Sequence, residues 1–246
     1  MRHKLICCDV FTREIYQTLL ESNNNVFPVF TLKMSHDYPD YLRELLQKEI
    51  DNTDPNIFSH ILLCYGLCGN AIAGLKTQDI PVVIPRAHDC CTIFLGSKQS
   101  HKEHFGHRPS CRWTSGGYMQ DGDYYIRNSK MHKMLGIDMS LEELIEKYGE
   151  ENAHYIFESL SPKDGSDNQT IYIETPPYEK SDMKKRIENE ALDKGQDFEV
   201  IRGDTRLINM LINGQWNEEE FLIVPPFHII EGVYDDNFVI KAVPLT

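Results

Sequence analysis

Short apolar segments alternate with amphipathic segments along this chain, and this alternation is the feature that most limits its fold. The segments that have the composition of strands are Leu5–Val10, Val26–Leu32, Ser59–Tyr65 and Ile80–Ile84. Helical spacing of apolar residues fills Thr12–Ser22 and Tyr38–Asp51, and Gly69–Leu75 is a further place where a helix is expected to begin. Buried strands that alternate with helices are typical of a parallel sheet with helices on both faces, so we predict an α/β fold.

The second half of the chain repeats the pattern after an irregular stretch. Residues Gly96–Arg127 are rich in Gly, Ser, His and aromatic side chains, which favours a long loop with some short elements. Ser140 and Glu143 form a capping box that predicts a helix over Leu141–Tyr148. The elements expected after it are a strand at Thr170–Glu174, a helix at Tyr178–Lys194, a strand at Phe198–Ile201, a helix at Thr205–Asn213 and a strand at Phe221–Val224.

We therefore predict two Rossmann-like lobes with mainly parallel sheets flanked by helices. The expected boundaries are residues 1–105 for the first lobe, 106–139 for an irregular connection and 140–246 for the second lobe. A cleft between two such lobes, or the carboxyl edge of a parallel sheet, is where a small-molecule ligand is expected to bind.

Charge and hydropathy exclude two kinds of partner. The chain has 25 Lys and Arg against 38 Asp and Glu, a formal net charge of −13, and no long basic stripe. Such a surface repels a phosphate backbone, so we expect no nucleic-acid partner. No apolar run approaches the roughly 18 residues that a membrane-spanning helix needs, so we expect no membrane partner either.

The seven cysteines are an odd number and cannot all be paired. The first residues run directly into a strand pattern without an apolar signal segment, which predicts a cytoplasmic protein. In a reducing compartment a cysteine serves as a ligand, as a nucleophile or as a small core residue more often than as half of a disulfide.

Four of the thiol and imidazole side chains follow directly after predicted strands. Cys8 ends the first strand, Cys68 follows the Ser59–Tyr65 strand, and His88 and Cys90 follow the Ile80–Ile84 strand. Because the carboxyl ends of parallel strands meet at one edge of a sheet, we expect these four side chains to converge. Three thiolates and one imidazole suit zinc or an iron–sulfur cluster.

The other candidate ligands have a structural interpretation. Cys7, Cys64 and Cys91 are expected in the core, and Cys111 is left unassigned. His101, His104 and His107 recur every third residue. In a helix, His101 and His104 would share a face and could hold a metal. Gly106 and Pro109 interrupt the segment, however, so solvent-exposed side chains are expected there. Gly66, Gly69 and Gly74 lack the spacing of a dinucleotide-binding loop.

The residues around the expected site resemble the pattern of the domain-of-unknown-function family 1638. The matching positions are Cys8, Cys68-Gly69 with Gly74-Leu75, the segment Pro85–Cys90 followed by Ile93–Gly96, and the stretches Trp113–Tyr118 and Leu211–Val224. The resemblance covers nearly the whole chain, and the His88 segment is its most specific part. Members of that family are often encoded near corrinoid-dependent methyltransferases, which implies a role around methyl transfer or one-carbon metabolism.

These observations predict a metal-binding protein with zinc or an iron–sulfur cluster held by Cys8, Cys68, His88 and Cys90. We assign acid–base roles to His88 and Asp89, and contacts with a cofactor to Arg86, Gly69, Trp113 and Tyr118. The resemblance also implies a corrinoid as a possible cofactor, and a methyltransferase or corrinoid protein as a possible partner.

Two alternative functions stay open. The first is an accessory protein that handles a small molecule, a metal or a corrinoid without turnover. The second is a metal-free enzyme in which Cys68 or Cys90 is activated by His88.

Overall fold

The computed structural model describes residues 2–33, 35, 38–68, 70–107, 111–120, 141–150, 152–153, 169–233, 235 and 238–245. The chain divides into two compact units. The first comprises residues 1–102, 175–179 and 203–246, and the second comprises 103–174 and 180–202. The sequence-based boundaries placed everything after residue 140 in one lobe. The structure instead returns the chain to the first unit after Arg202, because a late strand pairs with the first sheet.

The first unit is built on a five-stranded sheet with the order β2-β1-β3-β4-β8. Its strands are β1 (Arg2–Cys8), β2 (Asn25–Thr31), β3 (His60–Cys64), β4 (Val82–Pro85) and β8 (Phe221–Val224). The first four pair in parallel, and β8 pairs antiparallel with β4. These are the apolar runs that the sequence marked as strands, and the predicted α/β class with mainly parallel pairing is confirmed.

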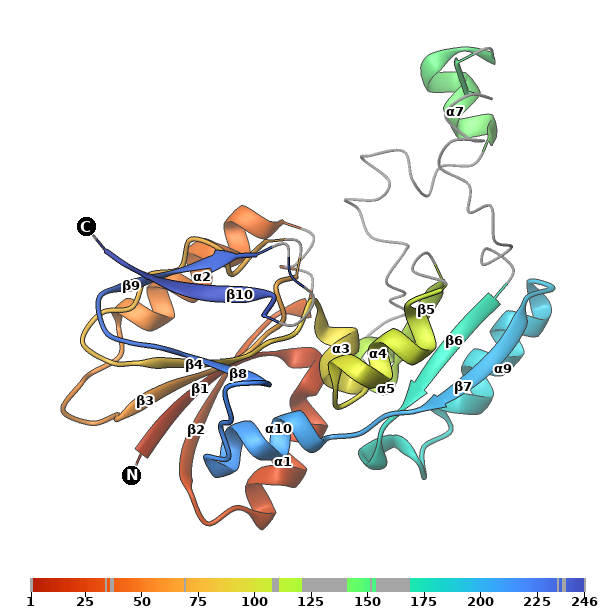
Figure 1. Ribbon diagram of the computed structural model, residues 1–246. Helices are drawn as coiled ribbons and strands as arrows, with labels where there is room; N and C mark the ends of the chain where they lie inside the picture. Colours follow the sequence, from red (N-terminus) through yellow and green to blue (C-terminus); the bar gives the residue numbers. More distant parts are fainter. Residues whose placement is uncertain are drawn as a thin grey trace. The chain divides into compact units, whose positions relative to one another are not determined.

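Helices cover both faces of this sheet (Figure 1). Helices α1 (Thr12–Glu21) and α10 (Arg206–Asn213) contact each other, and α10 also contacts β3 and β4. Helix α2 (Pro39–Asp51) begins with a proline at its first turn and buries Leu42, Leu46 and Ile50, which are spaced four apart along one face. The connections from β1 to β2 and from β2 to β3 run in opposite directions across the sheet. The carboxyl ends of β1 and β3 therefore flank the point where the strand order reverses, a usual position for ligands in open α/β sheets.

Short helical elements follow β1 and β4. The 3₁₀ turn η1 (Asp9–Phe11) follows β1, and helices α3 (Cys90–Phe94) and α4 (Lys98–Phe105) follow β4. Helix α4 is one of the short elements expected within Gly96–Arg127. The expected helix at Gly69–Leu75 is absent, since the described residues between Asn70 and Gly74 form turns.

A hairpin that the sequence did not predict completes the first unit. Strands β9 (His228–Gly232) and β10 (Ile240–Pro244) pair antiparallel. Phe227 before β9 and Val239 before β10 both have positive φ angles, 60° and 59°. Left-handed backbone at bulky residues costs about 1–3 kcal/mol and is maintained only where surrounding contacts impose it.

The second unit contains a smaller, fully parallel sheet with the order β5-β6-β7. Its elements are β5 (Arg112–Ser115), α5 (Gly116–Met119), α7 (Leu141–Tyr148), β6 (Gln169–Glu174), α9 (Met183–Asp193) and β7 (Asp197–Arg202). Met119, Tyr172 and Ile187 form its buried core cluster. The 3₁₀ turn η4 (Pro176–Tyr178), which contacts α1, belongs to the first unit and replaces the start of the helix expected at Tyr178–Lys194.

No helix in the part of the chain that the structure describes has both the length and the apolar character needed to cross a membrane.

Candidate metal centre

The loops that follow β3 and β4 run side by side at the carboxyl edge of the five-stranded sheet. Leu67 N donates a hydrogen bond to Ala87 O at 2.9 Å, and Cys68 N donates one to His88 O at 3.0 Å. Gly66 permits this approach, because a Cβ atom there would lie 2.6 Å from Asp89 Cα. The sequence-based expectation that these two loops are neighbours is therefore met at the level of the backbone.

The predicted ligands take different environments at this edge. Cys8 is buried at the end of β1, Cys68 and Cys90 are half-buried, and His88 is exposed. Cys68 has a positive φ of 45°, which is strained for a residue with a side chain. Gly69, a predicted contact for a cofactor, lies outside the described residues.

Cys8 and Cys90 are near enough to interact electrostatically. Burial raises the pKa of the Cys8 thiol well above its ordinary value, and the charges of Asp9 and Cys90 raise it further. Cys8 Sγ also lies 3.8 Å from Asp9 Oδ1. In the absence of a positive partner, this environment keeps the Cys8 thiol protonated.

The structure brings together a different trio of ligand atoms. Among the described residues, the group whose ligand atoms all lie within 4.8 Å of one another consists of Asp89, Cys91 and His101. The predicted set of Cys8, Cys68, His88 and Cys90 does not supply three ligand atoms within that distance. Asp89 is shared between the predicted functional residues and the observed trio.

Helix capping places Asp89 in this trio. Asp89 is the N-cap of α3, and its Oδ1 accepts hydrogen bonds from Thr92 N at 3.0 Å and from Thr92 Oγ1 at 3.2 Å. Helix α4 supplies His101, whose Nε2 lies 4.0 Å from Asp89 Oδ1. Asp89 and His101 are half-buried, which leaves the trio open to solvent on one side.

Cys91 is the buried member of the trio, with 1% of its surface exposed. Burial raises the pKa of its thiol well above the ordinary value, and the neighbouring charges of Asp89 and Cys90 add to this effect. A metal ion that binds here must therefore displace the thiol proton.

Helical geometry explains why Cys91 rather than Cys90 joins the trio. In α3, Cys90 lies four residues before Phe94, so the two share a helix face, and the Phe94 ring packs on Phe11 at 4.5 Å between centroids. Cys91 is turned from that face by about 100°. The burial of Cys91 agrees with the sequence-based expectation. The sequence pattern did not identify Asp89 as a helix N-cap beside Cys91 and His101.

Arg86 makes several hydrogen bonds within the fold, and its predicted contact with a cofactor stays a prediction. Its Nε donates to Glu218 O at 2.9 Å, and its Nη1 donates to Phe238 O at 2.8 Å and Ile240 O at 2.6 Å. The last two carbonyls lie on either side of Val239, so the guanidinium holds that strained turn against the end of β4. Burial lowers the pKa of Arg86.

We expect Arg86→Lys to destabilise the protein by about 2 kcal/mol, since an ammonium cannot supply the guanidinium fork. Urea unfolding of the wild type, Arg86→Lys and Arg86→Gln measures this. If Arg86→Lys were as stable as the wild type, the positive charge of Arg86, and not the several hydrogen bonds of its guanidinium, would stabilise the turn at Val239.

Trp113 and Tyr118, the remaining predicted contacts for a cofactor, belong to the second unit. They are buried there and contact each other edge to face, with 5.5 Å between ring centroids. Their role beside a ligand stays a prediction.

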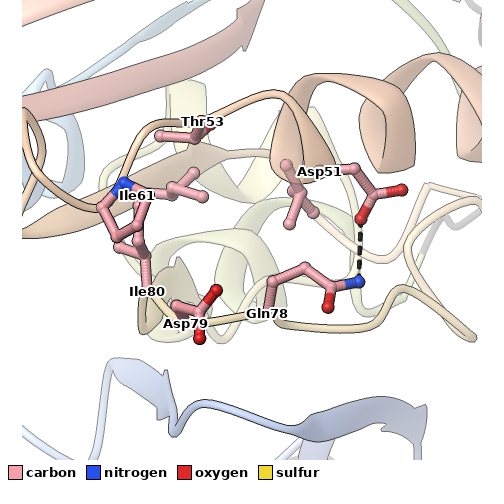
Figure 2. A pocket seen from close by; sticks show the side chains of 8 residues that line it. Asp51, Thr53, Ile61, Gln78, Asp79 and Ile80 are labelled. Atoms are coloured by element: carbon pink, nitrogen blue, oxygen red, sulfur yellow. Dashed lines mark hydrogen bonds between the residues drawn. The ribbon is translucent and has the colours of Figure 1, made fainter.

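A small pocket lies at the other, amino end of the sheet (Figure 2). It has a volume of about 240 Å³ and is lined by residues that include Asp51, Gln78 and Asp79. Gln78 Nε2 donates to Asp51 Oδ1 at 3.0 Å, as the dashed line in Figure 2 shows. None of the predicted site residues lines this pocket.

Comparison with known proteins gives one family. A family model described as "Protein of unknown function (DUF1638)" matches residues 30–212, a span that includes Cys68, the segment after β4 and His101. No curated protein and no solved structure matches the chain.

Proposed function

Because the chain belongs to the DUF1638 family of proteins of unknown function, we propose its function from its own geometry: it binds a divalent transition metal, zinc in the first place, through Asp89, Cys91 and His101. The observation that carries this proposal is the mutual distance of at most 4.8 Å between the three ligand atoms. A carboxylate, a thiolate and an imidazole are all ordinary zinc ligands.

Three protein ligands leave a fourth position for water or substrate. This is the arrangement of catalytic zinc sites, whereas structural sites are closed by four protein ligands. The half-buried Asp89 and His101 give solvent access to such a position. A metal held in this way acts as a Lewis acid or lowers the pKa of a bound water. His88, which directly precedes Asp89 in the chain, is a candidate for proton transfer there.

The test is zinc affinity by competition with a chromogenic chelator, with metal content measured after anaerobic purification. We expect about one zinc per chain in the wild type. We expect Cys91→Ser and His101→Gln to weaken binding at least tenfold. Asp89→Asn keeps an oxygen for the helix cap, so a loss of affinity in that variant reports on metal binding rather than on folding.

Cys68→Ser is the matched control, because Cys68 lies at the same sheet edge but outside the trio. It should bind zinc like the wild type. Loss of zinc in Cys68→Ser with full binding in Cys91→Ser would contradict the proposal and favour the thiol set instead. A wild type that binds no transition metal would overturn both.

That thiol set is the second candidate: Cys8, Cys68 and Cys90 with His88, holding zinc or an iron–sulfur cluster. It is supported by the paired loops after β3 and β4 and by the electrostatic interaction between Cys8 and Cys90. Its side chains must move to bring their ligand atoms together. An iron–sulfur cluster would give visible absorption in anaerobically purified protein, and a featureless spectrum with bound zinc would exclude it.

A place beside corrinoid-dependent methyl transfer, which the family resemblance implies, is a further proposal. Titration with cobalamin and with methylated amines distinguishes an accessory protein of methyl transfer from an enzyme. Saturable binding without product supports an accessory protein, and product formation supports an enzyme. Iodoacetamide labelling at one site well below pH 8 would favour the metal-free Cys–His enzyme.

A further inference from the structure

A second pocket in the first unit lies between β2, the turn after it and α2. Its volume is about 410 Å³, within the range of pockets that hold small molecules. It covers the carboxyl half of β2, where Val29 pairs with Ile6 and Thr31 pairs with Cys8. Ligands of open α/β sheets gather at the carboxyl ends of the strands, so this is a favourable place for one.

The walls of this β2–α2 pocket are mostly apolar. Val29 and Leu45 contribute aliphatic surface, and Tyr38 and Tyr41 contribute aromatic rings. Both tyrosines are about half exposed, at 45% and 54%. Aromatic rings that are open to solvent beside an apolar wall can be covered by the apolar body of a ligand.

Thr31 and Ser35 both carry a hydroxyl and both line the pocket, but only the Thr31 hydroxyl has a hydrogen-bond partner among the described residues. The Thr31 hydroxyl is bonded to the Tyr65 hydroxyl. Ser35 is only 6% exposed, lines the pocket and has no side-chain hydrogen bond to any residue that the structure describes. Its backbone is fixed, since its N–H bonds Leu32 O at 2.9 Å and its carbonyl accepts from Tyr38 N at 3.1 Å. The Ser35 hydroxyl is therefore a candidate hydrogen-bond donor to a ligand in this pocket.

Among the described residues that line the pocket, the charged side chains are those of Lys48 and Glu49. Glu49 is neutralised by Lys4, whose Nζ lies 2.8 Å from Glu49 Oε2 and also donates to Glu49 O. Lys48 lines the pocket and has no ion pair with any described residue. In a protein with a net charge of −13, such a local cation selects for an anionic group on the ligand.

We propose that the β2–α2 pocket binds a small carboxylic acid with an apolar or aromatic body. The body packs against Val29, Leu45 and the tyrosine rings, the carboxylate pairs with Lys48, and the Ser35 hydroxyl donates a hydrogen bond to it. This proposal is independent of the metal centre, because no residue of the trio lines the pocket.

The test uses three probes of nearly the same shape and different charge: phenylacetate, phenylacetamide and phenethylamine. Isothermal titration or ligand-observed NMR should show saturable binding of phenylacetate, binding of the amide about tenfold weaker, and no binding of the amine. Lys48→Gln should weaken phenylacetate binding about tenfold and leave the amide unchanged, and Ser35→Ala should weaken both.

Lys76→Gln is the matched control, since Lys76 is an exposed lysine of the same unit outside the pocket. It should bind like the wild type, and a metal chelator should not change the result. The proposal is overturned if phenylacetate does not bind at millimolar concentration, if phenethylamine binds as tightly, or if Lys48→Gln leaves phenylacetate affinity unchanged.

Discussion

Replacing Glu14 with glutamine is expected to make the protein about 3 kcal/mol more stable at pH 8 and to have little effect near pH 4.5. Glu14 lies on α1 and is fully buried against the sheet. Thr175 Oγ1 donates a hydrogen bond to its Oε1 at 2.6 Å, whereas its Oε2 is buried and has no hydrogen-bond partner among the described residues. A carboxylate in this position would be a poorly solvated charge.

Burial raises the pKa of Glu14 to about 7, and the opposing effects of the Thr175 hydroxyl and the Arg13 charge do not offset it. Below about pH 4.5 the Glu14 carboxyl is protonated in both the folded and the unfolded chain, so its ionisation does not lower the free energy of unfolding. Between about pH 4.5 and 7 the unfolded chain loses this proton and the folded chain keeps it, so the free energy of unfolding falls as the pH rises. Above pH 7 both states are ionised, and the penalty stays constant.

Urea unfolding of the wild type and Glu14→Gln at several pH values between 4.5 and 8 measures this difference. The glutamine carbonyl can still accept the Thr175 hydrogen bond, so the comparison isolates the ionisation. Glu21→Gln, at the exposed end of the same helix, is the control and should show no such trend. A stability difference between Glu14→Gln and the wild type that does not change with pH would contradict the raised pKa.

The apolar runs predicted the strands of the first sheet because strands buried on both faces have a nearly continuous apolar sequence. The hairpin β9–β10 was missed for a physical reason. Both of its strands begin directly after a residue with left-handed backbone, Phe227 before β9 and Val239 before β10. Such backbone is usually signalled by glycine or asparagine, and neither residue stands at these two positions. Arg86 holds the second of these turns from a distant part of the sequence, a contact that local patterns do not encode.

The sheet edge that carries the candidate site could be predicted, but the ligand set could not. Parallel pairing places the residues after β3 and β4 together whatever their side chains are. Which side chains converge depends on the conformation after β4. The structure begins a helix at Cys90 with Asp89 as its N-cap. In this helix the Cys91 thiol lies near Asp89 and His101.

The second prediction with a large expected effect concerns Gly66, whose backbone lies against that of Asp89. We expect Gly66→Ala to destabilise the protein by about 4 kcal/mol and to weaken metal binding at least tenfold. The new Cβ would lie 2.6 Å from Asp89 Cα and 2.7 Å from both Asp89 N and Asp89 C. All three are backbone atoms, so no side-chain rotation relieves the overlap. The two loops must separate, which breaks the Leu67–Ala87 and Cys68–His88 backbone hydrogen bonds and displaces the Asp89 carboxylate from the trio.

Gly232→Ala is the matched control in the same unit, because its Cβ would meet Asn70 Oδ1 at an ordinary contact distance of 3.6 Å. Thermal unfolding and zinc competition on both variants separate the two parts of the prediction. If Gly66→Ala lost stability but kept full zinc affinity, the position of Asp89 would not matter for the metal, and the trio would be wrong as a binding site. If it kept both, the close approach of the loops after β3 and β4 would not exist in solution, and every argument for a site at this edge would lose its basis.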